Sequence, residues 1–224
     1  DLETVNRVFT KAKPEIVLHL AAQALVRRSY SDPKTTFDTN LGGSVNILEA
    51  VRSAPSVRAL VYITSDKCYL NKEVTRGYRE DDELGGRDPY SASKAAAEQA
   101  FAAYRASFFT SSDTPGLASA RAGNVIGGGD WSTDRIVPDC IRALAQGRDI
   151  VLRNPKATRP WQHVLDPLNG YLLLAANLCR DPGSSPGSWN FGPGADVAMS
   201  VGDLAEQIVA LWGSGRIRIE TPAD

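Results

Sequence analysis

Tyr90 and Lys94 stand four residues apart at the start of a predicted helix. Side chains at this spacing lie on the same helix face. A nearby ammonium group favours the phenolate and lowers the pKa of a tyrosine from its ordinary value of about 10, which suits the phenol to act as a base. The spacing alone is a weak signal, because the chain has seven tyrosines. An exposed Tyr–Lys pair on a helix is the other interpretation.

Ser65, Asp66 and Lys67 directly follow the short apolar segment 60–64, which is typical of a buried strand. The carboxyl ends of parallel strands are where such folds hold their ligands. Ser65 can donate a hydrogen bond to a substrate oxygen while Tyr90 takes the proton from that oxygen. Asp66 and Lys67 can supply an acid and a base. A Ser/Asp turn that ends a strand is the alternative, since such turns are common.

Small residues follow another strand-like segment, in the sequence His19-Leu20-Ala21-Ala22-Gln23. A ligand could approach the backbone closely there, or the small side chains could simply pack at a strand–helix corner. We expect His19 to be a hydrogen-bonded core histidine rather than a catalyst.

Two later segments, 121–127 and 159–164, carry polar residues that suit a nucleotide. The planar fork of Arg159 gives two parallel hydrogen bonds to a diphosphate. Asn124 can bind a hydroxyl or a carbonyl group. Either residue could equally be structural, because Arg and Asn commonly close loops.

Strand and helix patterns alternate through the first part of the chain. Strands are expected at 15–20, 60–64 and 117–125, and helices at 2–11, 32–52 and 88–109. One face of the helix at 32–52 is expected to carry Phe37, Leu41, Val45, Leu48 and Val51. This alternation predicts βαβ units and a parallel sheet with helices on both faces.

From Ser132 onward, shorter helical patterns at 136–146, 167–178 and 201–212 are separated by connections rich in Pro and Gly. The predicted fold class is therefore α/β, a Rossmann-like doubly wound parallel sheet with a smaller mixed C-terminal substrate lobe. We place the sheet domain at 1–130 and the lobe at 131–224.

The composition excludes several classes of protein. The 224 residues include 25 Lys and Arg against 26 Asp and Glu, and the resulting net charge of −1 argues against nucleic acid or an anionic membrane as partner. Three widely spaced cysteines favour neither disulfides nor a metal site. The longest apolar segment, 171–178, is too short to span a membrane. A soluble, cytoplasmic protein is the default expectation.

The order of these motifs resembles the extended short-chain dehydrogenase/reductase family, and within it the nucleotide-sugar 4,6-dehydratases. Several segments specifically resemble the dehydratases that act on CDP-glucose. They are 21–30, 64–69, 77–80, 84–86, 128–131 and 159–164. The pair Asp66-Lys67 is the sharpest of these features, because the relatives that act on thymidine-diphosphate sugars have Asp-Glu.

The resemblance implies an NAD-dependent lyase that converts CDP-glucose to CDP-4-keto-6-deoxyglucose through an internal redox cycle. It assigns catalysis to Ser65, Asp66, Lys67, Tyr90 and Lys94. The cofactor would contact Leu20, Ala21, Ala22, Thr39, Tyr90 and Lys94, and the sugar nucleotide Asn124, Arg135 and Arg159. A homodimer through the two long helices is also implied.

Two alternatives stay open. An NAD-dependent nucleotide-sugar epimerase or reductase would share Ser65, Tyr90 and Lys94 but would need no acid–base pair at 66 and 67. A non-catalytic relative would bind a nucleotide or a partner without turnover.

The family's glycine-rich dinucleotide turn, G-x-x-G-x-x-G, does not occur in this sequence. Gly127-Gly128-Gly129 does not replace it, because this cluster follows a late strand. We expect a fragment that lacks the first βαβ portion of the NAD-binding domain and part of the lobe, and that is inactive alone.

Residues 1–224 by themselves are therefore predicted not to hold NAD. The pyrophosphate of a dinucleotide normally sits on such a turn at a helix N-terminus, where free N–H groups and the helix dipole favour an anion. Isothermal calorimetry of this chain with NAD should show no binding. A micromolar dissociation constant would contradict the prediction.

Overall fold

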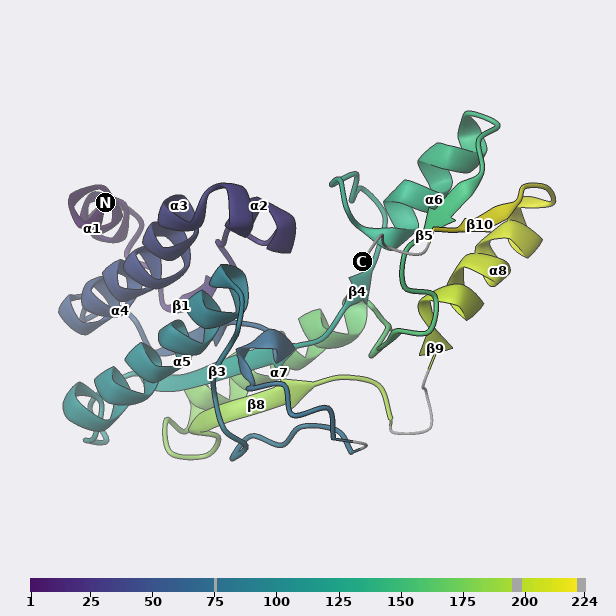
Figure 1. Cartoon of the computed structure of the whole chain (residues 1–224). Coiled ribbons are helices and arrows are strands. Elements are labelled where there is room, and N and C mark those ends of the chain that lie inside the picture. The colour runs from purple at the N-terminus through teal and green to yellow at the C-terminus, as the bar shows by residue number, and fades with distance from the viewer. Residues whose placement is uncertain (75, 195–198, 221–224) are drawn as a thin grey trace. The chain divides into compact units, whose positions relative to one another are not determined.

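A computed structural model describes residues 1–74, 76–194 and 199–220 (Figure 1). The chain divides into two compact units. The first joins Asp1–Ala122 with Asp166–Phe191, and the second joins Gly123–Leu165 with Gly192–Asp224. This division differs from the predicted boundary at residue 130, because a helix and a strand from the second half of the chain return to the sheet of the first unit.

The described residues of the first unit form a four-stranded parallel sheet in the order β1-β2-β3-β8. The strands are β1 (Ile16–His19), β2 (Ala59–Ile63), β3 (Gly116–Ala122) and β8 (Gly187–Phe191). β2 lies between β1 and β3, so the residues that follow it leave the sheet between two neighbouring strands.

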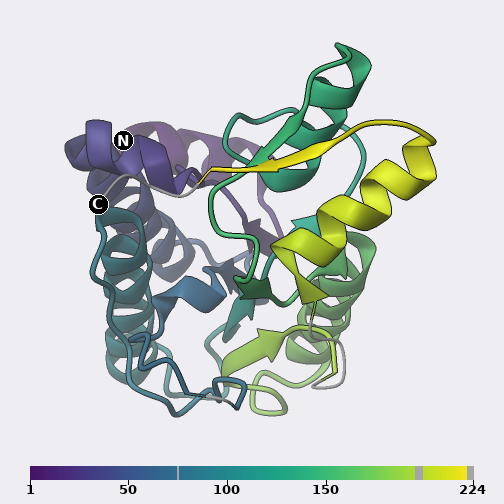
Figure 2. The same ribbon diagram turned by 45° about the vertical axis from the view of Figure 1, so that its right-hand side comes forward.

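Helices cover both faces of this sheet, and the residues of β2 alternate between them. Leu60 and Tyr62 pack towards α4 (Gly43–Ser53) and α5 (Pro89–Phe108), with α1 (Leu2–Ala12) beside α4. Ala59 and Val61 pack towards α7 (Leu165–Arg180). Figure 2 shows the strands between these two groups of helices. The predicted Rossmann-like doubly wound α/β fold is confirmed.

Local sequence sets the start of α5, the helix that carries Tyr90 and Lys94. Asp88 caps it by accepting hydrogen bonds from the Ser91 amide at 3.0 Å and the Ser91 hydroxyl at 2.7 Å, and Pro89 occupies the first turn. Gly86 passes so close to this turn that a Cβ there would lie 2.5 Å from the Ala92 nitrogen. Only glycine fits at this position.

The predicted helix at 32–52 is interrupted, and its expected apolar face is partly wrong. The chain forms α2 (Val26–Ser31), α3 (Pro33–Phe37) and then a π-helical turn, η1 (Asp38–Gly42), before α4. Leu48 and Val51 are buried as expected, but ahead of them the polar residues Thr36, Asn40 and Ser44 are buried. Phe37, Leu41 and Val45 are only half-buried, because the buried row lies one position earlier and its members repeat every four residues: Thr36, Asn40, Ser44 and Leu48.

Two differences at strands have clear causes. The strand expected at 117–125 ends as β3 at Ala122, because the chain then leaves the sheet for the second unit. β8 was not predicted, since its sequence Gly-Ser-Trp-Asn-Phe lacks an apolar run. Backbone hydrogen bonds to β3 hold this segment as a strand, although its composition does not indicate one.

The second unit is smaller and mixed. Its core contains Cys140, Leu144, Ile150, Leu152 and Ala205. It is built from α6 (Ile136–Ala145), α8 (Val201–Trp212), β4 (Val125–Ile126), β5 (Ile150–Leu152), β6 (Thr158–Arg159), β7 (Gln162–His163), β9 (Met199–Ser200) and β10 (Ile217–Ile219). No helix in the described part of the chain is long and apolar enough to cross a membrane.

Leu178 tests the packing of α7 on the sheet. It is fully buried, and its Cβ lies 3.0 Å from where a side chain on Gly116 would begin, so the two residues fit closely. We expect Leu178→Ala to lower the free energy of unfolding by about 2–5 kcal/mol, through lost burial and a cavity.

The matched control is Leu172→Ala on the same helix, where the leucine is 60% exposed. It should change stability by no more than about 0.5 kcal/mol. Urea unfolding of both variants would measure the difference, and equal effects would contradict the packing described.

Candidate active site

The turn after β2 brings three polar side chains together. Ser65 precedes η2 (Asp66–Cys68), a single 3₁₀ turn, and its hydroxyl accepts a hydrogen bond from the Lys67 amide at 3.3 Å. The same hydroxyl donates to Asp66 Oδ1 at 2.9 Å, and Lys67 Nζ lies 3.3 Å from that oxygen. The Asp66 and Lys67 side chains are about one-third exposed, so water or a ligand can reach this ion pair.

α5 packs against η2, and this contact sets the serine turn beside the tyrosine–lysine helix. Tyr90 is 7% exposed and Lys94 is 5% exposed. The structure therefore gathers all five predicted catalytic residues on two packed elements of the first unit.

Burial changes the charge behaviour of Lys94. Desolvation lowers the pKa of Lys94 to about 8, against the opposing effect of the carboxylate of Glu98 one turn further along α5. Lys94 is therefore cationic at neutral pH. Lys94 follows Tyr90 by one helical turn, so this cation and the phenol lie on the same side of α5.

A buried hydrogen-bond network, which was not predicted from the sequence, holds the loop after β1. Asn40, in the π turn η1, accepts from the Gln23 amide at 2.8 Å and donates to the Gln23 carbonyl at 3.1 Å. Its amide also donates to the Ser93 hydroxyl at 2.9 Å, directly before Lys94. Gln23 donates to Thr36 at 2.9 Å. The one available clue was the run of polar residues at positions 36, 40 and 44, spaced four apart.

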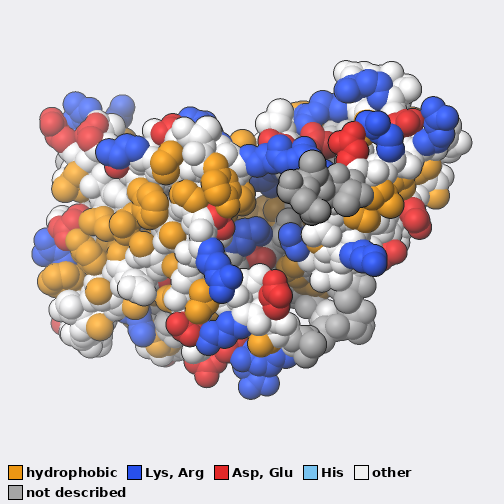
Figure 3. Space-filling view, in the orientation of Figure 1, with side chains coloured by type: hydrophobic (Ala, Val, Ile, Leu, Met, Phe, Trp, Pro, Cys, Tyr) orange, Lys and Arg blue, Asp and Glu red, His pale blue; other side chains and the backbone are white. Residues whose placement is uncertain are grey.

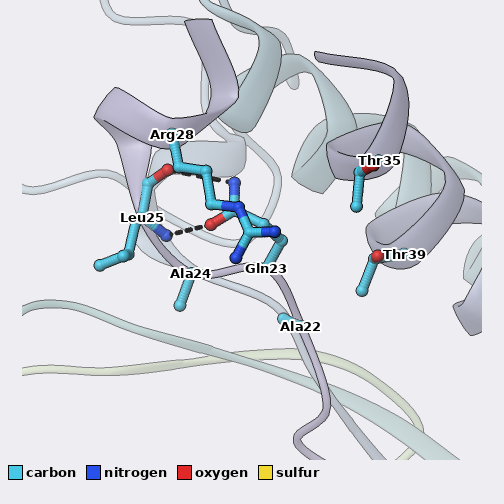
Figure 4. A pocket seen from close by; sticks show the side chains of 7 residues that line it. All are labelled: Ala22, Gln23, Ala24, Leu25, Arg28, Thr35 and Thr39. Atoms are coloured by element: carbon cyan, nitrogen blue, oxygen red, sulfur yellow. Dashed lines mark hydrogen bonds between the residues drawn. The ribbon is translucent and has the colours of Figure 1, made fainter. Parts of the chain in front are cut away.

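A pocket of about 360 Å³ opens beside this loop (Figure 4). It is lined by Ala22, Gln23, Ala24, Leu25, Arg28, Thr35 and Thr39. Two of the predicted cofactor residues, Ala22 and Thr39, line it, whereas Leu20 and Ala21 lie on the exposed strand end that leads to it. Small side chains, two hydroxyls and one arginine suit a polar ligand that carries negative charge.

The predicted sugar-nucleotide residues all lie in the second unit. The two segments that carry Asn124 and Arg159 are neighbours there, because β4 pairs with β7 and the Gln162 amide donates to the Asn124 carbonyl at 3.1 Å. Gly123 lies against Pro160, where a Cβ would meet the proline ring at 2.6 Å. Arg159 is exposed, and Arg135 forms an ion pair with Asp130 at 3.3 Å.

Comparisons with known proteins identify the family of this chain. Residues 1–192 match the NAD dependent epimerase/dehydratase family. The chain is 47% identical over 217 residues to a CDP-glucose 4,6-dehydratase of Salmonella typhimurium, covering 95% of this chain and 60% of that protein.

Solved structures share the fold. A Thermus thermophilus UDP-glucose 4-epimerase in complex with NAD superimposes with a TM-score of 0.81 at 26% identity, covering all of this chain and 71% of that one. A dTDP-glucose 4,6-dehydratase from Streptomyces venezuelae gives a TM-score of 0.83 at 19% identity and 65% coverage of its length.

The chain belongs to the NAD dependent epimerase/dehydratase family. It spans 60% of the length of the Salmonella CDP-glucose 4,6-dehydratase to which it is similar.

His19 is a buried histidine whose charge state couples to stability. It is 7% exposed, its Nε2 lies 3.0 Å from the Ser44 hydroxyl, and its ring packs 5.4 Å from that of Tyr62. Burial, with a smaller effect of Lys94, lowers its pKa from 6.5 to about 4. These contacts agree with the expectation of a hydrogen-bonded core histidine.

The folded state thus prefers the neutral ring, and protonation favours unfolding. We expect the contribution of His19 to be complete above pH 6.5 and to decline as the pH falls towards 4, by about 3 kcal/mol in total. Denaturant unfolding of the wild type and of His19→Gln at several pH values would measure it. The stability difference between the two should shrink below pH 6.5, and a pH-independent difference would contradict the assignment.

Proposed function

We propose that the whole protein is an NAD-dependent hydro-lyase that removes water from CDP-glucose to give CDP-4-keto-6-deoxyglucose. The carrying observation is the Asp66–Lys67 ion pair, held by Ser65 on a turn that packs against the Tyr90–Lys94 helix. The 47% identity to a CDP-glucose 4,6-dehydratase supports the substrate.

Tyr90 is proposed as the base that takes the proton of the sugar C4 hydroxyl. The buried Lys94 cation lowers the cost of forming the phenolate. Ser65 would donate to the same substrate oxygen. To do so its hydroxyl must turn away from Asp66 Oδ1, which also releases that oxygen for chemistry.

The residues present fit part of the NAD cofactor. The pocket beside Ala22 and Thr39 has small walls, with Arg28 for an anionic group, and Leu20 and Ala21 lie on the strand end that leads to it. Tyr90 and Lys94 would contact the cofactor from α5. When bound, NAD would supply the redox chemistry, as the acceptor of the C4 hydride and the source of the hydride returned to C6.

Asp66 and Lys67 are proposed to carry the elimination. Once C4 is a ketone, the C5 hydrogen is acidic. Lys67 is the candidate base at C5 and Asp66 the acid that protonates the leaving C6 hydroxyl. Lys67 Nζ lies 3.3 Å from Asp66 Oδ1, so a charge that orients Asp66 is the rival role for Lys67.

Asn124, Arg135 and Arg159 are proposed to bind the sugar nucleotide, with Arg159 on the diphosphate. Its exposure in the second unit leaves the guanidinium available to an anion. Arg135 would exchange its half-exposed partner Asp130 for the ligand.

An NAD-dependent nucleotide-sugar epimerase is the second candidate, supported by the likeness to a UDP-glucose 4-epimerase at 26% identity. Such an enzyme would use Ser65, Tyr90 and Lys94 but would not need the Asp66–Lys67 pair for catalysis. Its product would have the mass of its substrate. A non-catalytic relative would give no product.

A homodimer through α4 and α5 is also proposed. Phe37, Leu41 and Val45 are only half-buried, and on α5 Ala100 is partly exposed and Ala103 is exposed. In Figure 3 apolar side chains gather over the region of α3, α4 and α5. A second copy would cover this strip.

The cytoplasm is the proposed location, supported by three unpaired cysteines in the described chain.

The proposal is tested on the full-length protein with a panel of nucleotide-glucoses and mass spectrometry of the products. CDP-glucose should lose one water, and the other nucleotide sugars should react more slowly. A product of unchanged mass would favour the epimerase.

Tyr90→Phe serves as the internal control for the chemistry. It should lower kcat by about 10²–10⁴-fold while leaving CDP-glucose binding nearly intact, because the phenol transfers a proton but contributes little contact area. Activity within a few-fold of wild type would remove Tyr90 from the mechanism.

A further inference from the structure

Two charged side chains are buried together in the first unit without a part in the proposed chemistry. Glu98 on α5 is 1% exposed and Arg121 on β3 is 4% exposed, and Arg121 Nη2 lies 2.6 Å from Glu98 Oε2. A buried ion pair is costly to form and is retained only when its geometry and its remaining hydrogen bonds are good.

The remaining hydrogen bonds of Glu98 come from residues on, or directly after, three strands of the sheet. Its carboxylate accepts hydrogen bonds from the hydroxyls of Thr64, Ser119 and Ser188, the last two at 2.9 and 3.3 Å. Thr64 immediately precedes Ser65, and Glu98 follows Lys94 by one helical turn. The carboxylate therefore ties the helix that carries the base to the strand end that carries the serine.

The other arm of Arg121 reaches the loop after η2. Nη1 donates to the Tyr69 hydroxyl at 2.8 Å and to the Glu80 carbonyl at 3.0 Å. The guanidinium carbon also lies 5.0 Å from the centre of the Tyr69 ring. Tyr69 is the first residue after the turn that carries Asp66 and Lys67.

Tyr69 is held from a second side. Its hydroxyl donates to Asn190 Oδ1 at 2.6 Å, and Asn190 in turn donates to the Tyr78 carbonyl at 2.9 Å. Burial raises the pKa of Tyr69 to about 12, so the hydroxyl keeps its proton at neutral pH. Arg121 is thus the link between Glu98 and the far end of the Asp66–Lys67 turn.

We infer that Arg121, oriented by Glu98, is a positioning residue for the elimination step: it fixes the Asp66–Lys67 turn through Tyr69. The inference rests on the proposed dehydratase function. The oxidation step depends less on Arg121, because Glu98 still holds α5 against the strands through the hydroxyls of Thr64, Ser119 and Ser188. The Asp88 cap also fixes the start of α5, where Tyr90 lies.

The rival explanation is that the pair only stabilises the fold. In that case a substitution would lower the melting temperature and slow oxidation and elimination to the same extent. A positioning role predicts a split between the two steps.

Arg121→Lys in the full-length protein separates these explanations. Lysine keeps a charge for Glu98 but is a single point donor, so it cannot hold Glu98 and Tyr69 together. With CDP-glucose, the rate of C4 oxidation, followed by the absorbance of bound NADH, should stay within about 3-fold of wild type. Release of the dehydrated product and exchange of the C5 hydrogen with deuterium should fall by at least about 10-fold, as expected for a misplaced catalytic group.

Arg52→Lys is the matched control. Arg52 also pairs with a carboxylate, Glu49, at 2.7 Å and lies 5.1 Å from an aromatic ring, that of Phe108, but its side chain is 44% exposed on α4. Both steps should run at wild-type rates in this variant.

Tyr69→Phe is the second test, for the case in which Arg121→Lys shows no cooperative melting. It keeps the ring and removes the hydroxyl that joins Arg121 to Asn190, and the same split in smaller measure is expected. Equal loss of both steps, or unchanged elimination, in a folded variant would overturn the positioning role.

The measurement on the wild-type protein distinguishes a failure of this inference from a failure of the proposed function. If the wild type releases no dehydrated product, both fall. If it does so and neither variant shows the split, only the inference about Arg121 falls.

Discussion

The carboxylate of Glu98 is the constraint on which the first unit depends. It lies on α5 and accepts hydrogen bonds from side chains on β3, on β8 and at the end of β2. Such a group cannot leave its partners without exposing a bare charge to an apolar interior. The helix that presents Tyr90 and Lys94 is therefore held in one register against the strand ends, which catalysis by positioned groups requires.

A second polar network works in the same way on the other side of Lys94. Asn40 and Gln23 exchange hydrogen bonds between the π turn and the loop after β1, and Asn40 reaches Ser93 on α5. This arrangement fixes Gln23, which forms part of the wall of the pocket beside Ala22 and Thr39. Both networks join α5 to neighbouring elements through buried hydrogen bonds, which specify one arrangement of the helix.

The local elements and the reactive positions follow closely from sequence. Asp88-Pro89 predicts the start of α5, and the apolar run at 60–64 predicts β2, because both signals depend on only a few neighbouring residues. Ser65, Asp66 and Lys67 could be placed at a strand end for the same reason. The sequence did not reveal that β8 completes the sheet, since Ser188 and Asn190 make it look like a loop until pairing with β3 satisfies its backbone.

The amino-acid sequence by itself determined the α/β class, the order of the motifs, and the tyrosine–lysine and aspartate–lysine pairs, because these depend on short-range periodicity and residue type. Only the tertiary structure decided which side of the helix at 33–53 is buried, and that Glu98 and Arg121 meet from α5 and β3. Thr36, Asn40 and Ser44 are buried because their hydrogen-bond partners lie on other parts of the fold, which helical periodicity alone does not indicate. An ion pair between residues 23 positions apart forms only when the sheet brings its two elements together.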